Sequence, residues 1–512
     1  MGPTKLDLDV VGIGALNVDY IASAPPSSAD GTELDLRRRI SKIVSAAPSP
    51  FQWGAETLVD ERIVYAALEE MSAPSLDVTL GGSAWNAIYA LEQMRLGLRL
   101  GYVGVAGRVR VPGISSLQQL EMLGIDHTFV RRSDRRDSGI CLSYVDGGER
   151  TLLTAPGANV ELAQLLEERF EELAQYLART KVVHITSLLD PESPRHLLTL
   201  LRRMKRINPG TVLTFDPGHT WASSPTPEVE GILSLSDYLL VNTAEFAALG
   251  NADGGEPDEA IAARLMQRLD SPDAVVIVKR SDGVTALHQD SGAIERRQFA
   301  QTPLSDDGIQ DATGAGDVFA AGLLAVIAGS RLQLELGASL GMRLAGHKLR
   351  YVGAQGHAEF PAIAQDFIRI RAAERQHRPL PQGVFISHGA NPQWHAVRDF
   401  IERECKLPTQ VFESHLWSSR QVTKALAEYL RRCGFAVCVL TAEDLAEDGT
   451  RRPRQNVIHE AGLFQGRYGF DRVMLLAEEG CALLPELAGL PAIRFPHGRI
   501  DVTFRRLQKM IG

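Results

Sequence analysis

Short apolar runs rich in β-branched residues alternate with amphipathic helical stretches along most of the chain, up to about residue 370. We predict strands at 8–13, 100–105, 182–185, 212–215, 238–241 and 275–278, and helices at 162–178 and 194–207. Strands that alternate with helices in this way are typical of a parallel sheet covered by helices. The sequence therefore predicts an α/β fold for this part of the chain.

A polar segment with two prolines separates this region from a second, shorter α/β alternation. The segment at 373–382 is predicted to be a linker, followed by strands at 384–387, 436–440 and 472–477 and helices near 392–404 and 456–466. A chain of 512 residues allows about three domains at roughly 150 residues each. The pattern nevertheless predicts two domains, at 1–372 and 383–512. Residues 22–77, which include a helical pattern at 58–71, interrupt the first βαβ region, and we expect them to form an insertion over one side of the first domain.

The composition excludes several classes of protein. Lys and Arg number 54 against 63 Asp and Glu, a net charge of −9, so the basic surface typical of nucleic-acid binding is not expected. The longest apolar run, 318–329, is shorter than the roughly 20 residues of a membrane-spanning helix. The N-terminus lacks signal-peptide features, and five scattered cysteines make no disulfide framework. We expect a cytoplasmic protein that binds neither nucleic acid nor membranes.

The most specific local pattern is Asp-Ala-Thr-Gly-Ala-Gly-Asp at 311–317, which runs directly into an apolar helical stretch. Small residues let backbone N–H groups approach a phosphate, and a helix N-terminus adds partial positive charge. Asp317 at the first turn can accept the proton of an attacking hydroxyl in phosphoryl transfer. The alternative is a glycine-rich helix cap whose Asp is favoured by the helix dipole.

A second glycine pattern, at Gly12 and Gly14, begins like a dinucleotide-binding fingerprint. Asn17 replaces the third glycine, and no helix-opening pattern follows before the proline pair at 25–26. The sequence therefore does not predict a Rossmann dinucleotide site at the first strand.

The loop at 311–317 resembles the second signature of the ribokinase/PfkB family of sugar and nucleoside kinases. Other motifs that match this family occur in the same order: Asn17-Val-Asp19, Gly81-Gly82-Ser-Ala-Trp-Asn86, Gly157-Ala-Asn159, Asp216-Pro217 and Asn242-Thr-Ala-Glu245. The resemblance covers about residues 6–372. It implies a ribokinase-like α/β sandwich domain with a lid, and an ATP- and Mg²⁺-dependent kinase of a small sugar or nucleoside.

The resemblance also implies roles for individual residues. Asp317 would be the general base, and the anion hole for the transferred phosphoryl group would be Gly314, Ala315 and Gly316. Asn242 and Glu245 would organise the metal and phosphates, and the substrate would be held by Asp19, Gly81, Gly82 and Asn86. The chain departs from the family pattern at Ala312, at 104–107, at His219 and at 278–283, where the first glycine of the nucleotide-binding turn is missing. A kinase fold that serves as a ligand sensor is therefore an alternative.

In the second domain, polar clusters follow the predicted strands or open the helices, where α/β proteins bind ligands. They lie at 385–389, 439–444 and 454–464. Asn456 and Glu460 are four residues apart and share a helix face, beside apolar residues expected to pack inward. A carboxylate near the buried side of a helix is a candidate functional acid. The alternative is an exposed Glu460 paired with Arg454.

Residues 383–512 resemble the TIR-like predicted nucleotide-binding domains of bacterial defence proteins. The motifs that carry this resemblance are Val-Phe-Ile-Ser-His-Gly at 384–389, Ala-Val-Cys-Val-Leu-Thr-Ala-Glu-Asp at 436–444 and Arg-Gln-Asn-Val-Ile-His-Glu-Ala-Gly-Leu-Phe at 454–464. The resemblance implies a flavodoxin-like parallel α/β fold and cleavage of NAD, with Glu460 as the catalytic residue. Ser387, His388 and Gly389, together with Asn456, would bind NAD, and a homo-oligomer is implied.

Two aromatic pairs have alternative roles. Trp394 and Trp417 could stack on a base, although core packing is the alternative for each. Phe51 and Trp53 in the insertion could stack on a nucleobase, or the insertion could cover a dimer face.

The combined motifs predict a two-part effector of antiviral defence, in which a kinase-like domain binds or phosphorylates a small ligand and a TIR-like domain hydrolyses NAD. The alternative is an active carbohydrate or nucleoside kinase regulated by a non-catalytic TIR-like nucleotide-binding domain. A scaffold without enzymatic activity is a third hypothesis, which the presence of both Asp317 and Glu460 disfavours.

Overall fold

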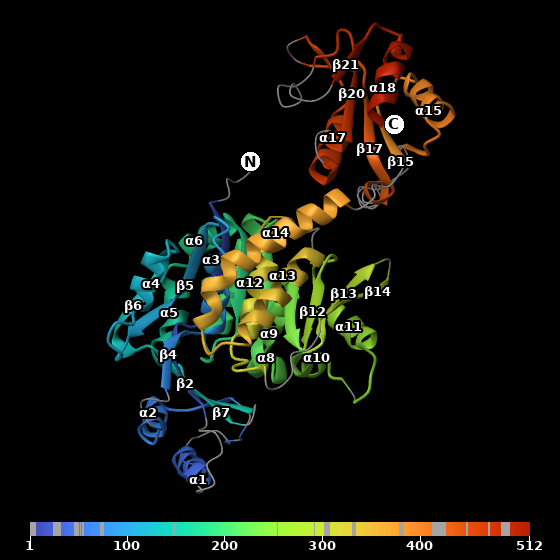
Figure 1. The fold of residues 1–512 in the computed structure, drawn as a ribbon. Helices are drawn as coiled ribbons and strands as arrows, with labels where there is room; N and C mark the ends of the chain where they lie inside the picture. The colour runs from blue at the N-terminus through green and yellow to red at the C-terminus, as the bar shows by residue number, and fades with distance from the viewer. Residues whose placement is uncertain are drawn as a thin grey trace. The chain divides into compact units, whose positions relative to one another are not determined.

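The computed structural model describes residues 7–23, 32–45, 51, 53, 56–71, 76–146, 149–252, 254–290, 292–301, 308–329, 334–377, 383–411, 426, 428–446, 449–468, 472–482 and 492–511. The chain forms two compact units, Met1–Ile370 and Arg371–Gly512 (Figure 1). Helix α14, Phe360–His377, extends through the first five residues of the segment predicted to be a linker. Residues 378–382, the rest of that segment, lie outside the described residues.

The first unit is built on a nine-stranded sheet, counted over the described residues, with the order β14-β13-β12-β11-β10-β9-β1-β5-β6. The strands are β1 Leu8–Ile13, β5 Leu100–Arg108, β6 Asp126–Asp137, β9 Thr180–Thr186, β10 Val212–Asp216, β11 Tyr238–Asn242, β12 Val275–Arg280, β13 Gly283–Asp290 and β14 Ala293–Ala300. Neighbouring strands from β12 to β6 pair in parallel, and only β13 and β14 are antiparallel to their neighbours. The predicted parallel sheet is therefore present.

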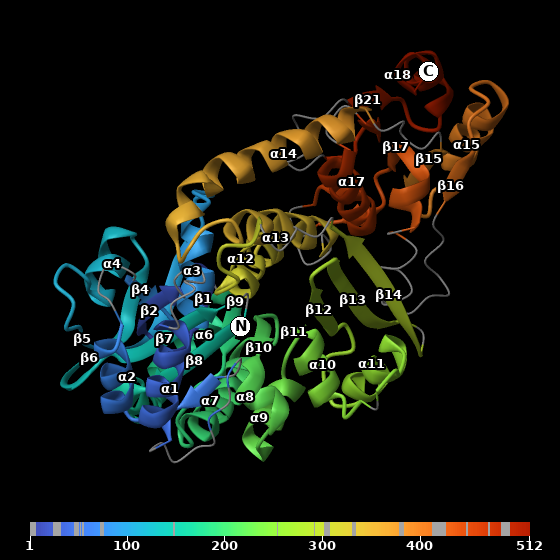
Figure 2. The ribbon, with the colours of Figure 1, turned by 60° about the horizontal axis from the view of Figure 1, so that its bottom comes forward.

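Helices cover both faces of this sheet, because successive strand residues point to opposite faces. In β1, Val11 and Ile13 pack into one core cluster and Val10 into the other. The first cluster contains α5 Leu162–Glu168, α6 Phe170–Ala178, α7 Ser193–Ile207, α8 Gly218–Ser223, α9 Pro227–Ser234, α10 Thr243–Leu249 and α11 Asp258–Met266. The second contains α3 Ser83–Gln93, α4 Ser116–Met122, α12 Ala315–Ile327, α13 Leu334–Lys348 and α14. Figure 2 shows α12, α13 and α14 on the face opposite α7, α8 and α9.

A separate five-stranded sheet, which we call the lid, has the order β3-β8-β7-β2-β4 among the described residues. Its strands are β2 Asn17–Ser23, β3 Glu56–Leu58, β4 Leu76–Gly81, β7 Gly139–Asp146 and β8 Glu149–Ala155. Helices α1, Thr32–Val44, and α2, Glu61–Glu69, bury an apolar cluster against this sheet (Figure 1). The described parts of the predicted insertion include β3, α1 and α2, and both of its predicted ends, residues 22 and 77, belong to lid strands.

Two helix predictions were wrong in their bounds. The predicted single helix at 162–178 is divided into α5 and α6 at Arg169, whose φ of −112° and ψ of 26° are not helical. The helical pattern from Leu58 to Met71 begins only at Glu61, after Asp60 caps α2 with its side chain, and Leu58 is the last residue of β3.

The second unit is a five-stranded sheet, over its described residues, with the order β16-β15-β17-β20-β21. All four neighbouring pairs are parallel. The strands are β15 Gly383–His388, β16 Thr409–Val411, β17 Cys433–Leu440, β20 Val473–Glu478 and β21 Ala492–Phe495. Helix α17, Gln455–Tyr468, packs on one face, while α15, Trp394–Arg403, and α18, Phe504–Ile511, pack on the other. Across the described part of the chain, no helix combines the length and apolar character that a bilayer-spanning segment requires.

Candidate functional sites

The Gly81–Gly82 pair joins lid strand β4 to helix α3 and lets two groups approach the backbone. A Cβ on Gly81 would lie 2.0 Å from the carboxylate of Asp19, which stands on the neighbouring strand β2. Gly82 has φ of 109° and leaves only 2.2 Å between a Cβ and the carbonyl oxygen of Ala15. A side chain at Gly81 would push the Asp19 carboxylate aside, and one at Gly82 would displace the backbone at Ala15. The pair therefore fixes Asp19 beside the first turn of α3.

Asp317 stands in the first turn of α12, whose N-cap is Gly314 in the left-handed conformation, with φ of 73°. The side chain of Asn86 on α3 donates a hydrogen bond of 2.9 Å from Nδ2 to Oδ2 of Asp317. Asn86 was predicted to hold substrate hydroxyls, and in the structure without substrate its amide orients Asp317. Two motifs that are 231 residues apart in sequence therefore meet in one site.

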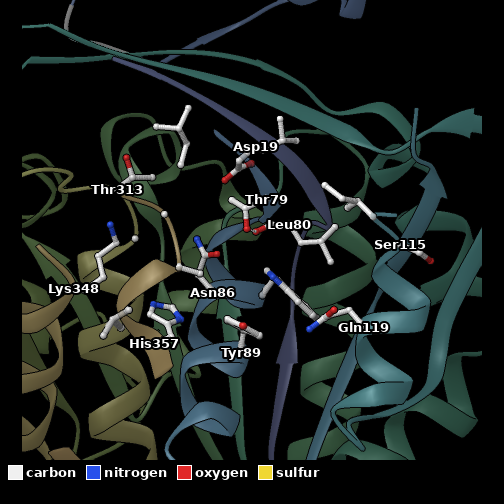
Figure 3. Close-up of a pocket in the computed structure, with 18 of the residues that line it drawn as sticks. Asp19, Thr79, Leu80, Asn86, Tyr89, Ser115, Gln119, Thr313, Lys348 and His357 are labelled. Carbon is white, nitrogen blue, oxygen red and sulfur yellow. Dashed lines mark hydrogen bonds between the residues drawn. The ribbon is translucent and has the colours of Figure 1, made fainter. Parts of the chain in front are cut away.

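A cavity of about 310 Å³ lies between the lid and the second core cluster. Among its lining residues are Asp19, Asn86 and Gly314, together with Tyr89 on α3, Gln119 on α4 and His357 on the 3₁₀ helix η4, Gln355–Glu359. Figure 3 shows Asp19 on the lid side and Tyr89 across from it, with Thr313 and Gln119 toward opposite ends. The cavity thus has a carboxylate and an amide, from Asp19 and Asn86, near Gly314, and aromatic and amide groups elsewhere, which suits a small polar ligand.

His357 is a buried polar group of this cavity. Both of its ring nitrogens lack a hydrogen-bond partner among the described residues, and the ring stacks on Phe360 with a centroid distance of 4.4 Å. Burial lowers the pKa of His357 to about 4, helped by the charge of Lys348. The imidazole is therefore neutral at pH 7. The insertion aromatics Phe51 and Trp53 do not line the cavity and pack on the lid beside Tyr144.

Lys279 is a residue that the sequence analysis missed. It lies at the end of β12, where its ammonium group is 2.6 Å from Oδ2 of Asp216 and 3.3 Å from the position of a Cβ on Gly316. Burial opposes its charge, but Asp216 and Glu245 outweigh that penalty and hold the pKa of Lys279 above the ordinary value. The sequence offered one signal for this residue, because Lys279 directly follows the apolar residues of a predicted buried strand. A fixed cation therefore lies against the predicted anion hole.

Asn242 and Glu245 are brought together as a capping box at the start of α10. The Asn242 side chain accepts from the Glu245 N–H at 2.9 Å, and Glu245 Oε2 accepts from the Asn242 N–H at 2.8 Å. Burial, and then the charge of Asp216, raise the pKa of the Glu245 carboxyl. No cluster of three or more His, Cys, Asp or Glu suited to a metal occurs among the described residues. Asn242 and Glu245 together offer one amide and one carboxylate. This pair fits Mg²⁺, which keeps several waters and takes few carboxylates besides substrate phosphates.

A buried ion pair holds the Asp317 loop in place. The ammonium of Lys348 is 2.8 Å from Oδ2 of Asp311, and it also donates to the carbonyls of Asp311 and Tyr351, at 3.1 and 3.0 Å. The Asp311 carboxylate accepts from the N–H groups of Thr313 and Gly353 at 2.7 and 2.9 Å. Burial opposes ionisation of Asp311, yet the nearby ammonium and these bonds hold its pKa below the ordinary value. The pair ties the loop to the cavity wall.

We expect Lys348→Met to destabilise the first unit by about 3–5 kcal/mol, because it leaves the Asp311 carboxylate buried without its cation. Urea unfolding measures the change. The matched control is Arg369→Met, which breaks an exposed pair with Asp366 and should cost less than about 1 kcal/mol. The double variant Lys348→Met, Asp311→Asn should recover part of the lost stability. If Lys348→Met destabilises the protein no more than Arg369→Met does, the Lys348–Asp311 pair does not hold the loop.

In the second unit, the carboxyl ends of β15 and β17 form the topological switch point of the sheet. The chain passes from β15 to β16 on one side and then crosses to β17 on the other. Ligands of open α/β sheets bind in the crevice at such a point. The predicted residues Ser387, His388 and Gly389 end or follow β15, so the structure places them at this crevice.

Glu460 on α17 lies beside these strand ends and is only 4% exposed. The Ser387 hydroxyl donates to Oε2 of Glu460 at 2.5 Å, and Asn456 also hydrogen-bonds the carboxyl group. Burial raises the pKa of Glu460 to about 7, against the opposing effect of these two hydrogen bonds. The alternative of an exposed Glu460 paired with Arg454 is wrong, because Arg454 contacts Glu443 and Asp444 instead.

The remaining predicted residues have mostly structural contacts. The His388 ring stacks on Trp394 with a centroid distance of 4.2 Å, and its Nδ1 is 2.6 Å from the Gly389 carbonyl oxygen. Trp394 is 5% exposed within the apolar core, which confirms the core-packing alternative. Trp417 lies outside the described residues. A Cβ on Gly389 would lie 2.2 Å from the Glu443 carboxylate, so the glycine leaves room for that carboxylate in its present position.

Comparisons with known proteins find relatives of both units. Residues 57–360 match the pfkB family carbohydrate kinase, and residues 383–497 match the TIR domain of the CAP12/Pycsar effector protein. An uncharacterized sugar kinase from Archaeoglobus fulgidus is 29% identical over 233 residues, 45% of this chain and 83% of that protein. The Pycsar effector protein PaPycTIR from Pseudomonas aeruginosa is 37% identical over 117 residues, 22% of this chain and 38% of that protein.

The solved structure of adenosine kinase from Sinorhizobium meliloti aligns with a TM-score of 0.56 and 22% identity, over 70% of this chain and 99% of that one. This likeness confirms the predicted ribokinase-like fold. The chain therefore belongs to the pfkB family of carbohydrate kinases, and it carries a C-terminal TIR domain of the CAP12/Pycsar effector type.

Proposed function

We propose that this protein is a two-part effector of bacterial antiviral defence that acts in the cytoplasm. Its first unit binds or phosphorylates a small sugar- or nucleoside-type ligand, and its TIR domain hydrolyses NAD to nicotinamide and ADP-ribose. The observation that carries the NAD hydrolysis is the buried Glu460, held by Ser387 and Asn456 at the switch point of the sheet. The relative PaPycTIR, named as a Pycsar effector, supports the role in defence.

In the TIR domain, hydrolysis breaks the bond between the ribose C1′ and the nicotinamide nitrogen, and nicotinamide leaves as a neutral base that needs no proton. Water supplies the oxygen of the new C1′–OH group and releases one proton to solvent. The ribose becomes oxocarbenium-like as nicotinamide departs. A fixed carboxylate stabilises that developing positive charge, as in glycoside hydrolysis. Glu460 would provide this carboxylate, and the Ser387 hydroxyl would hold it in one orientation. His388, Gly389 and Asn456 would contact the dinucleotide at the same crevice.

In the kinase unit, Asp317 would accept the proton of the ligand hydroxyl that attacks the γ-phosphate of ATP. Asn86 orients the Asp317 carboxylate, and the Asp19 carboxylate would hold other ligand hydroxyls beside Gly81 and Gly82. The N–H groups of Gly314, Ala315 and Gly316, with the Lys279 ammonium, would receive the transferred phosphoryl group. Glu245 and Asn242 would organise Mg²⁺, which neutralises phosphate charge when bound.

The two activities can be measured separately on the purified full chain. In the first assay, nicotinamide release is measured with NAD alone and with NAD plus each member of a panel of sugars and nucleosides. In the second assay, ADP formation from ATP is measured with the same panel. We expect the protein to release nicotinamide, and we expect at least one sugar or nucleoside of the panel to increase the rate of release. We also expect the protein to be a homo-oligomer. ADP formation without nicotinamide release under any condition would instead support the kinase with a non-catalytic TIR domain.

The rate of nicotinamide release should rise with pH between about 6 and 8. The Glu460 pKa of about 7 means that the carboxyl group is mostly neutral at pH 6 and mostly ionised at pH 8. Since only the carboxylate stabilises the oxocarbenium ion, activity is lost as pH falls through 7. A pH–rate profile of kcat/KM for NAD reports this free-enzyme group, and a flat profile across this range would contradict the assignment.

A further inference from the structure

The Glu443 carboxylate lies in the loop after β17 and accepts hydrogen bonds from four donors that converge on it. Oε2 accepts from the N–H of Ala390 at 2.7 Å and from Nε of Arg454 at 3.3 Å. Oε1 accepts from the N–H of Asn391 at 3.1 Å and from the hydroxyl of Thr441 at 2.5 Å. Two consecutive backbone amides, one hydroxyl and one guanidinium are all donors that suit a phosphate group.

These donors lie at the strand ends that also carry the proposed active site. Ala390 and Asn391 follow β15 within four residues of Ser387, which hydrogen-bonds Glu460. Thr441 follows β17, the other strand of the switch point. The carboxylate also lies against Gly389, where a Cβ would be 2.2 Å away. The donors therefore lie at the same strand ends as Ser387 and its partner Glu460, where the dinucleotide would bind.

Arginines lie near these strand ends, and Arg454 contacts both Glu443, at 3.3 Å, and Asp444, at 3.7 Å. Strand β19 carries Arg451 and Arg452, and Arg454 follows two residues later. Burial opposes ionisation of Glu443, but the bonds from Thr441 and from the two backbone amides hold its pKa below the ordinary value. Glu443 is therefore an anion at neutral pH, and its 15% exposed side chain lies where solvent can reach it.

We propose that the amides of Ala390 and Asn391, with Thr441 and Arg454, form the site for the diphosphate of the dinucleotide, and that Glu443 occupies it as an internal anion. The inference rests on the proposed NAD hydrolysis. Two negative charges of the diphosphate and the Glu443 carboxylate cannot share these donors, so the ligand must displace Glu443. The apparent affinity is then reduced by the fraction of molecules in which Glu443 is displaced.

Binding of ADP-ribose to the full chain, measured by titration calorimetry, tests the site independently of turnover. Glu443→Gln keeps the shape of the side chain and removes its charge, and we expect ADP-ribose to bind at least about tenfold more tightly than to the unmodified chain. The KM for NAD should fall by a similar factor. The matched control, Glu479→Gln, changes an exposed residue after β20 and should leave binding unchanged. Adding Arg454→Gln to Glu443→Gln should reverse the gain, which assigns the binding to this site.

Equal or weaker ADP-ribose binding by Glu443→Gln would overturn the proposal and show that Glu443 only tethers the loop. If Glu443→Gln does not fold, as judged by circular dichroism, Glu443→Asp replaces it, because its carboxylate is one methylene shorter and reaches the amides less well. The same tightening is expected of it, and unchanged or weaker binding would again overturn the proposal. Tighter ADP-ribose binding without nicotinamide release would leave this site standing and reject NAD hydrolysis.

Discussion

Glu460→Gln should abolish nicotinamide release and at the same time make the TIR domain more stable above pH 7. The amide keeps the acceptor for the Ser387 hydroxyl but cannot carry the charge that stabilises the oxocarbenium ion. The stability gain follows from burial, since the folded pKa is about 7 against an ordinary value of 4.5. Ionisation therefore destabilises the folded state as pH rises from about 4.5 to 7, by about 3 kcal/mol in full.

Two measurements test both parts of this prediction. Nicotinamide release is compared at pH 8, and urea unfolding is compared at pH 5 and pH 8. The variant should exceed the unmodified chain in stability at pH 8, and the difference should shrink at pH 5. Glu479→Gln, an exposed carboxyl in the same unit, should change neither quantity. Release that survives Glu460→Gln would remove Glu460 from the mechanism.

Asp317→Asn should reduce phosphoryl transfer by about 10²–10⁴-fold, the usual contribution of a positioned general base. The amide oxygen can still accept the hydrogen bond from Asn86, so the α3–α12 contact and the folded state should persist. The loss is therefore expected in kcat, with a smaller change in KM for the acceptor. ADP formation from ATP across a panel of sugars and nucleosides measures it.

The control for this variant is Asp134→Asn, which removes a charge from an 81% exposed side chain in the same unit. It should leave transfer unchanged. Full activity in Asp317→Asn would exclude Asp317 as the base. If the unmodified chain phosphorylates no panel member but some members raise its melting temperature, the first unit is a sensor.

Much of the fold could be predicted because it depends on local patterns. The strands predicted at 8–13 and 238–241 correspond to β1 and β11 within one residue, since buried parallel strands are continuous apolar runs. Glycines that require positive φ or close contact, such as Gly82 and Gly314, stood out in the sequence for the same local reason. The break at Arg169 could not be predicted, because the apolar period continues through it.

Contacts between distant segments could not be predicted from any local pattern. In the sequence, Lys279 is part of the segment 278–283, which departs from the family pattern. Only the order of β10, β11 and β12 in the sheet brings its side chain to Asp216. The Lys348–Asp311 pair joins the end of one helix to the loop before another. The sequence assigned no role to Glu443, although it lies in the polar cluster at 439–444. The backbone amides that donate to it, those of Ala390 and Asn391, lie about fifty residues earlier in the chain.

The sequence by itself determined the two α/β units, the order of their strands and helices, and the choice of Asp317 and Glu460 as the proposed catalytic side chains. Hydrophobic periodicity and backbone preferences act within a few residues, so these features are encoded locally. The tertiary structure decided how those side chains are held: Asn86 orients Asp317, burial raises the pKa of Glu460, and Glu443 fills the donors beside it. Burial and long-range hydrogen bonds exist only once the sheets and helices have packed together.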